Sequence, residues 1–196
     1  MRLRFASIGF QTAALLLIGA FALGAARPDA KQQTSPSHPT EPPPEEAERD
    51  SLSGLAGVEV LVEPLDSEIE QVGLSAAKLQ QDVRQRLQKA GVKVLTERER
   101  LANPATAVLI VRLETLHDRI GRYFYTTDVL LAQRVKLETH AGQEFSAVTW
   151  KKLGTVSTIA DDNVKHLEDQ VLRKVDQFIK DYLATNPDRK VTDQRR

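Results

Sequence analysis

The segment from residue 123 to residue 139 shows a two-residue repeat. Apolar side chains dominate its odd-numbered positions, whereas charged side chains such as Asp128 and Arg134 fall on even-numbered ones. Because successive side chains of a strand point to opposite faces, this pattern predicts a long strand with one buried face. A short connection containing Gly142 and a second extended segment, 145–150, follow it. The sequence therefore predicts a β-hairpin here.

The rest of the folded region contains further short extended segments and two amphipathic ones. Three more strands are predicted, at 58–62, 92–96 and 107–116. One helix is predicted to begin at the N-cap residue Ser75 and to end before Gly91. A longer helix is predicted to begin at Asp161 or Asp162 and to end at Asn186. The order β-α-β-β-β-β-α predicts an α+β fold, a mostly antiparallel sheet with two helices packed on one face.

The first 26 residues have the parts of a secretory signal peptide. Arg2 and Arg4 precede an apolar run that ends in small residues. This pattern predicts export and a periplasmic or secreted protein. The alternative is an inner-membrane protein anchored by an uncleaved N-terminal segment, because residues 5–26 are just long enough to span the bilayer.

Residues 27–50 hold six of the nine prolines among polar side chains, and they predict a disordered Pro-rich spacer. A single α+β domain is expected at 55–187, and a polar tail at 188–196. The lack of cysteine excludes disulfides, thiolate metal sites and a lipidated N-terminal cysteine. Equal numbers of basic and acidic residues, 27 of each, argue against nucleic acid as a partner.

Few residues suggest catalytic or metal chemistry. No histidine has a partner at the spacing that metal sites use; the four are His38, His117, His140 and His166. The run from Asp161 to Asn163 resembles a cation-binding triplet only in composition and is better explained as a helix cap. There is no Gly-x-Ser-x-Gly motif and no Gly-rich phosphate loop. We therefore expect no metal, no cofactor and no enzymatic activity.

If both helices cover the odd-numbered positions, the even-numbered face of the sheet stays open. That face is predicted to combine apolar, aromatic and charged side chains, namely Val108, Ile110, Phe124, Asp128, Leu130, Arg134, Val148 and Trp150. An uncovered face of this kind is a candidate for binding a partner. The alternative is that a loop, the spacer or a second copy of the chain covers it. Glu114 and Asp128 could form an acid/base pair across the strands. Ordinary charge pairing of each carboxylate with neighbouring Arg and Lys side chains is the preferred interpretation.

Several short motifs carry a resemblance to a known group of proteins. They are Gly73-Leu74, Asp82-Val83, the run from Ala90 to Leu95, Asp128 with Gln133 and Val135, Thr149-Trp150, and the ending from Asp176 to Pro187. On these residues the region 58–187 resembles exported bacterial proteins of unknown function. The resemblance implies no activity and no functional residues. The layout is also similar to small α+β domains of periplasmic accessory proteins, such as the N-terminal domain of the Tol-system periplasmic protein and curli-secretion lipoproteins. Unlike the lipoproteins, the chain has no lipobox cysteine.

Two functional hypotheses follow from these observations. The first is a non-enzymatic exported envelope protein, a protein-interaction or accessory module whose open sheet face binds another envelope protein or a second copy of the chain. The alternative is a small-ligand-binding or hydrolytic periplasmic domain with a pocket between the C-terminal helix and the sheet.

Overall fold

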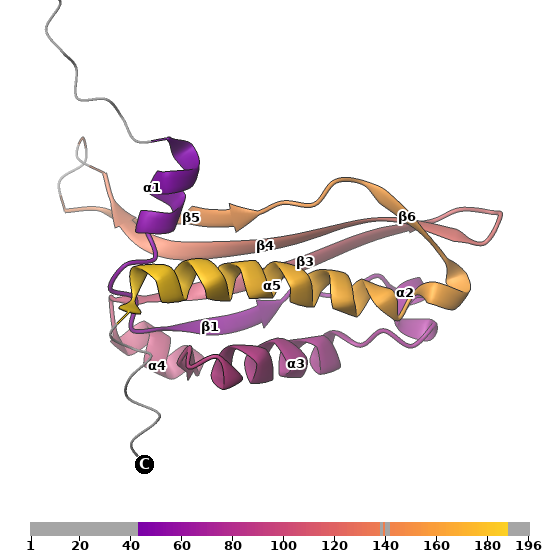
Figure 1. The fold of residues 1–196 in the computed structure, drawn as a ribbon, viewed down its shortest axis with the longest axis horizontal. Coiled ribbons are helices and arrows are strands. Elements are labelled where there is room, and N and C mark those ends of the chain that lie inside the picture. The colour runs from indigo at the N-terminus through magenta and orange to yellow at the C-terminus, as the bar shows by residue number, and fades with distance from the viewer. Residues whose placement is uncertain (1–42, 138, 140–141, 188–196) are drawn as a thin grey trace, which may run out of the picture. The chain divides into compact units, whose positions relative to one another are not determined.

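A computed structural model describes residues 43–137, 139 and 142–187 of the chain (Figure 1). The predicted signal peptide, most of the predicted spacer and the predicted tail lie outside the described residues, as do His38 and His140.

The described residues form a six-stranded sheet with the order β2-β1-β3-β4-β5, in which β6 pairs with β4 beyond the end of β5. The strands are β1 (Gly57–Val62), β2 (Val94–Leu95), β3 (Thr106–His117), β4 (Arg122–Lys136), β5 (Glu144–Lys152) and β6 (Ser157–Ala160). Strand β1 runs parallel to β2 and β3, and every other pairing is antiparallel. The predicted α+β fold with a mostly antiparallel sheet is confirmed.

Both predicted long helices pack on the odd-numbered face of the sheet. Helix α3 (Ala76–Lys89) packs beside β1, and helix α5 (His166–Thr185) packs along β4 and against α3 (Figure 1). Strand residues Leu109 and Leu131 are fully buried beneath them, together with Val83 of α3 and Phe178 of α5. The alternation of apolar residues along the strands thus produces one buried face, and neither long helix covers the even-numbered face.

Three short helices were not predicted from the sequence. They are α1 (Pro44–Asp50), α2 (Ser67–Gln71) and α4 (Glu97–Ala102). Helix α4 begins with a capping box, in which Thr96 and Glu99 each bond to the backbone of the other. Helix α2 begins where the Asp66 carboxylate accepts a hydrogen bond from the Glu68 N–H.

Helix α1 corrects the predicted boundary between spacer and domain, because residues 44–50 are helical and the chain after them is held in the core. Leu52 is fully buried. The Asn186 side chain accepts a hydrogen bond from the Gly54 N–H and donates one to the Leu52 carbonyl, both at 2.9 Å. The Tyr182 hydroxyl donates to the Leu55 carbonyl at 3.0 Å. The packed domain therefore begins at α1 and not at residue 55.

The predicted N-cap of the last helix is wrong. Residues Asp161–Asn163 form one 3-10 turn, η1, and α5 begins only at His166, without a side-chain cap. The Asp161 carboxylate lies instead 3.0 Å from Nε2 of His117 at the end of β3. The Asp161 side chain therefore interacts with a residue of a neighbouring strand and does not cap the helix.

Candidate functional site

The centre of the open face is an apolar patch built by cross-strand pairing. Strands β3 and β4 pair Val108 with Ala132 and Ile110 with Leu130, so that these four side chains form two adjacent rows. The rows continue onto the outer strands, because β1 sets Leu61 opposite Ile110 and β5 sets Val148 opposite Ala132. We call these residues the central patch: Leu61, Val108, Ile110, Leu130, Ala132 and Val148.

The central patch is most accessible at its two margins. Val148 is 51 % exposed and Leu61 is 45 % exposed, whereas Leu130 in the middle is only 8 % exposed. Val108 and Ile110 are half-buried. The predicted face residues Val108, Ile110, Leu130 and Val148 are therefore brought together, but Leu130 contributes little accessible surface.

The placement predicted for Trp150 is wrong. Leu131 pairs with Trp150 and Ala132 pairs with Val148, so Thr149 is an extra residue that forms a β-bulge. The bulge turns Trp150 towards the helices, where it is 2 % exposed. Its ring packs edge-on against Phe178 at 5.2 Å, and its Nε1 donates to the Asp181 carboxylate at 3.1 Å. Trp150 is thus a core residue.

Charged side chains next to the central patch are largely neutralised by one another. Arg112 donates two hydrogen bonds to Glu63, at 2.8 and 3.1 Å, and these bonds hold the pKa of Glu63 below its usual value. Asp128 lies opposite Arg112 and accepts a hydrogen bond from the Gly154 N–H at 2.8 Å. Glu114 lies opposite Thr126 instead, so the two carboxylates do not face each other across the strands. This pairing does not favour an acid/base role for them.

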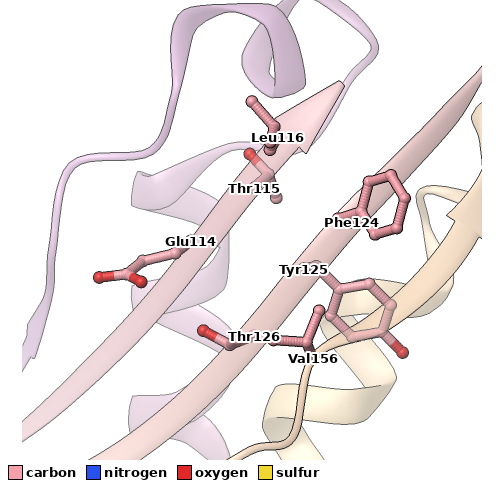
Figure 2. A pocket seen from close by; sticks show the side chains of 7 residues that line it. All are labelled: Glu114, Thr115, Leu116, Phe124, Tyr125, Thr126 and Val156. Atoms are coloured by element: carbon pink, nitrogen blue, oxygen red, sulfur yellow. The ribbon is translucent and has the colours of Figure 1, made fainter. Parts of the chain in front are cut away.

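A second apolar area lies towards the far end of the open face. It is a shallow hollow of about 310 Å³, lined by Glu114, Thr115, Leu116, Phe124, Tyr125, Thr126 and Val156 (Figure 2). Only Phe124 among these was predicted as a face residue. Leu116 lies at an even-numbered position of β3, so its place on the open face could have been predicted from the sequence. Val156 lies in the connection between β5 and β6, and the path of this connection depends on tertiary structure.

The remaining predicted face residue, Arg134, is exposed and lies opposite Ser146 on β5. It is ten residues from Phe124 along the same strand, a separation of about 33 Å. The predicted residues therefore do not form one compact site. They are distributed along the open face, with the central patch between Arg134 and the hollow beside Phe124.

No protein-family model and no curated protein sequence matches the chain. Among the described residues, no group of three or more His, Asp or Glu side chains could hold a metal ion. His117 stacks on Tyr123 at 4.4 Å beside Asp161, and His166 lies 3.5 Å from Asp169. In the part of the chain that the structure describes, no helix has the length and apolarity needed to cross a membrane.

The alternative hypothesis places a pocket between the C-terminal helix, α5, and the sheet. Five side chains along α5 are completely buried, namely Leu167, Val171, Val175, Phe178 and Tyr182. They belong to the buried apolar clusters between the helices and the sheet. The geometry of this interface therefore does not favour a ligand-binding domain of the expected kind.

Proposed function

We propose that the protein is a non-enzymatic interaction module of the cell envelope that binds a partner protein through the central patch. The observation that carries the proposal is the pair of half-exposed side chains, Leu61 and Val148, on a sheet face that neither long helix covers. Exposed apolar patches on soluble domains commonly mark interaction sites.

The charges beside the patch also support this function. A partner that covers the patch would remove the neighbouring charged groups from water, which is costly for an unpaired charge. Arg112 already bonds to Glu63, and Asp128 already accepts a backbone hydrogen bond. These groups keep their partners when the face is covered, so the cost of burying them is reduced.

The location in the envelope is part of the same proposal. It rests on the basic start, the apolar run and the small residues within residues 1–26, which are typical of an exported protein. An uncleaved segment would leave the same module anchored in the inner membrane.

A pair of charge insertions tests the proposal. We expect Val148→Asp and Leu61→Asp each to reduce partner capture at least about tenfold in crosslinking of the native envelope, because each places a charge inside the contact. Val72→Asp is the matched control, since Val72 is also half-exposed, at 43 %, but lies at the end of α2. The fluorescence of Trp150, the only tryptophan, checks that each variant is folded.

The outcomes separate the possible partners. Capture of another envelope protein that is lost in both face variants supports the proposal. Light scattering that detects a dimer in the wild type and a monomer in Val148→Asp would identify the partner as a second copy of the chain. If Val148→Asp and Leu61→Asp both capture the partner as well as the wild type does, the proposal is overturned.

A further inference from the structure

Strand β3 extends well beyond the strand beside it. Strand β1 pairs only with residues Thr106 to Val111 of β3, and the last hydrogen bond between them runs from the Glu63 N–H to the Val111 carbonyl at 2.9 Å. The chain then leaves the sheet at Pro64, whereas β3 continues to His117. The end of β3 therefore has a neighbouring strand, β4, on one side only.

The hydrogen bonds between β1 and β3 show which backbone groups of β3 point away from β4. The N–H and C=O groups of a strand residue point to the same side, and successive residues alternate. The Val111 carbonyl points towards β1, so the backbone groups of Leu113 and Thr115 also point to that side, away from β4. No described residue forms a hydrogen bond with these groups of Leu113 or Thr115. Unpaired backbone groups in a partly buried strand are rare and favour the addition of another strand.

Space for such a strand lies directly in front of this side of β3. A hollow of about 330 Å³ is bounded by Leu113, Glu114 and Thr115 on β3 and by Pro64, Leu65 and Asp66 on the segment that leaves β1. We call Leu113, Glu114 and Thr115 the β3 edge site. It differs from the central patch, which uses side chains of the open face rather than the backbone of a strand edge.

The surroundings of the β3 edge site are acidic. Glu114 has no ion pair with a described residue, and its carboxylate extends from β3 on the side away from Phe124 (Figure 2). Asp66 lines the hollow itself, and Glu68 follows it on α2. Burial raises the pKa of Tyr123, and the carboxylates of Asp161, Glu68 and Asp66 raise it further. A peptide with basic side chains is the complementary ligand.

We propose that the β3 edge site binds an extended, basic segment of a partner protein, which adds to the sheet as a strand in the line of β1. The backbone of the segment pairs with the N–H and C=O groups of Leu113 and Thr115, and a Lys or Arg side chain lies beside Glu114 and Asp66. Main-chain pairing of this kind supplies affinity, and the flanking side chains supply specificity.

The first test measures peptide binding to the full chain. The probe is a capped hexapeptide of alternating Lys and Val, and the controls are the same peptide with Glu in place of Lys and one with N-methyl groups on alternate backbone nitrogens. We expect the Lys peptide to bind at least about tenfold more tightly than either control. The methylated peptide loses one or two hydrogen bonds to β3, and the Glu peptide places a negative charge beside Glu114. Hydrogen exchange at the amides of Leu113 and Thr115 should slow on binding.

The second test uses variants at Thr115. Thr115→Pro removes an N–H that points away from β4, so the β3–β4 ladder is kept while strand addition is blocked. We expect a loss of affinity of about tenfold or more, whereas Thr115→Val keeps the N–H and should bind normally. Glu114→Lys, at an exposed position, should reverse the preference from the Lys peptide to the Glu peptide even if Thr115→Pro fails to fold.

Equal binding of the methylated peptide, unchanged exchange at Leu113 and Thr115, or no binding to the full chain would overturn the proposal. Val148→Asp should leave peptide binding unchanged, because Val148 lies on β5, in the central patch and outside the β3 edge site. A failure at the β3 edge site is thereby distinguished from a failure of the proposed function.

Discussion

Leu131 of β4 lies directly opposite Trp150 of β5, although the next residue of β4 lies opposite Val148. The extra residue between them, Thr149, reverses the direction of the side chains that follow it. Trp150 therefore enters the core, and Val148 becomes the most exposed residue of the central patch.

Contacts on both sides hold the bulge in place. Gln133 of β4 donates a hydrogen bond to the Thr149 hydroxyl at 2.7 Å. The Gln133 side chain also donates to the carbonyl of Ser51, directly after α1, at 2.9 Å. The composition of the open face thus depends on an irregularity that is stabilised by a segment about one hundred residues away in sequence.

Trp150→Ala should destabilise the fold. It removes a large buried side chain that packs on Phe178 and donates to Asp181, so we expect the free energy of unfolding to fall by about 3–5 kcal/mol. Urea denaturation followed by circular dichroism measures the change. Val148→Ala, at a half-exposed position two residues away, should change stability by less than about 1 kcal/mol. Similar values for the two variants would contradict the assignment of Trp150 to the core.

Deletion of Thr149 should restore regular alternation in β5. Either Trp150 or the residues before it must then point to the opposite face, because a one-residue shift exchanges the two faces of a strand. We expect the free energy of unfolding to fall by about 3 kcal/mol or more, because a large side chain is removed from the core. A red-shifted emission of Trp150 and stronger quenching by acrylamide should accompany the loss. Thr149→Ala keeps the residue count and should keep the blue-shifted emission.

The regular parts of the fold were predictable because their signals are local. The alternation in β4 placed Leu131 on the buried face, and the helical spacing in α5 placed Val171 and Phe178 on its apolar stripe. Each of these elements repeats one periodicity for many residues, so a single exception does not hide the pattern.

The parts that were missed depend on distant residues or on short signals. Helix α4 has a readable capping box at Thr96 and Glu99, but its six residues bury none of their side chains and therefore show no apolar period. Helix α1 begins at the last of three consecutive prolines, and its Arg49 lies 3.6 Å from Asp181 of α5. The bulge at Thr149 follows from strand pairing, which no local pattern of β5 encodes.

Asn186→Ala should loosen the segment after α1. The Asn186 side chain is 7 % exposed and satisfies backbone groups of Leu52 and Gly54, which would otherwise remain unpaired. We expect a loss of about 1–3 kcal/mol of stability, and faster hydrogen exchange at the Gly54 amide. Asn163→Ala is the matched control, because Asn163 is exposed and donates only to the adjacent Asp162. Equal effects of the two substitutions would show that the Asn186 contacts do not hold this segment.

The ion pair between α3 and α5 should make stability depend on pH in the acid range. Arg86 donates two hydrogen bonds to Asp176, at 2.7 and 2.6 Å, and these bonds lower the pKa of Asp176 below its ordinary value of 3.8. A carboxyl group whose pKa is lower in the folded state stabilises the fold above its unfolded pKa. This contribution is lost as the pH falls through the lower, folded-state pKa.

Asp176→Asn should therefore be less stable than the wild type at neutral pH, and the difference should shrink as the pH falls from about 5 to 2. The measurement is urea denaturation at a series of pH values in that range, with low salt to limit screening. Asp50→Asn serves as the control, because the side chain of Asp50 is exposed at the end of α1. A difference between Asp176→Asn and the wild type that stays constant across this range would show that Asp176 does not titrate against Arg86.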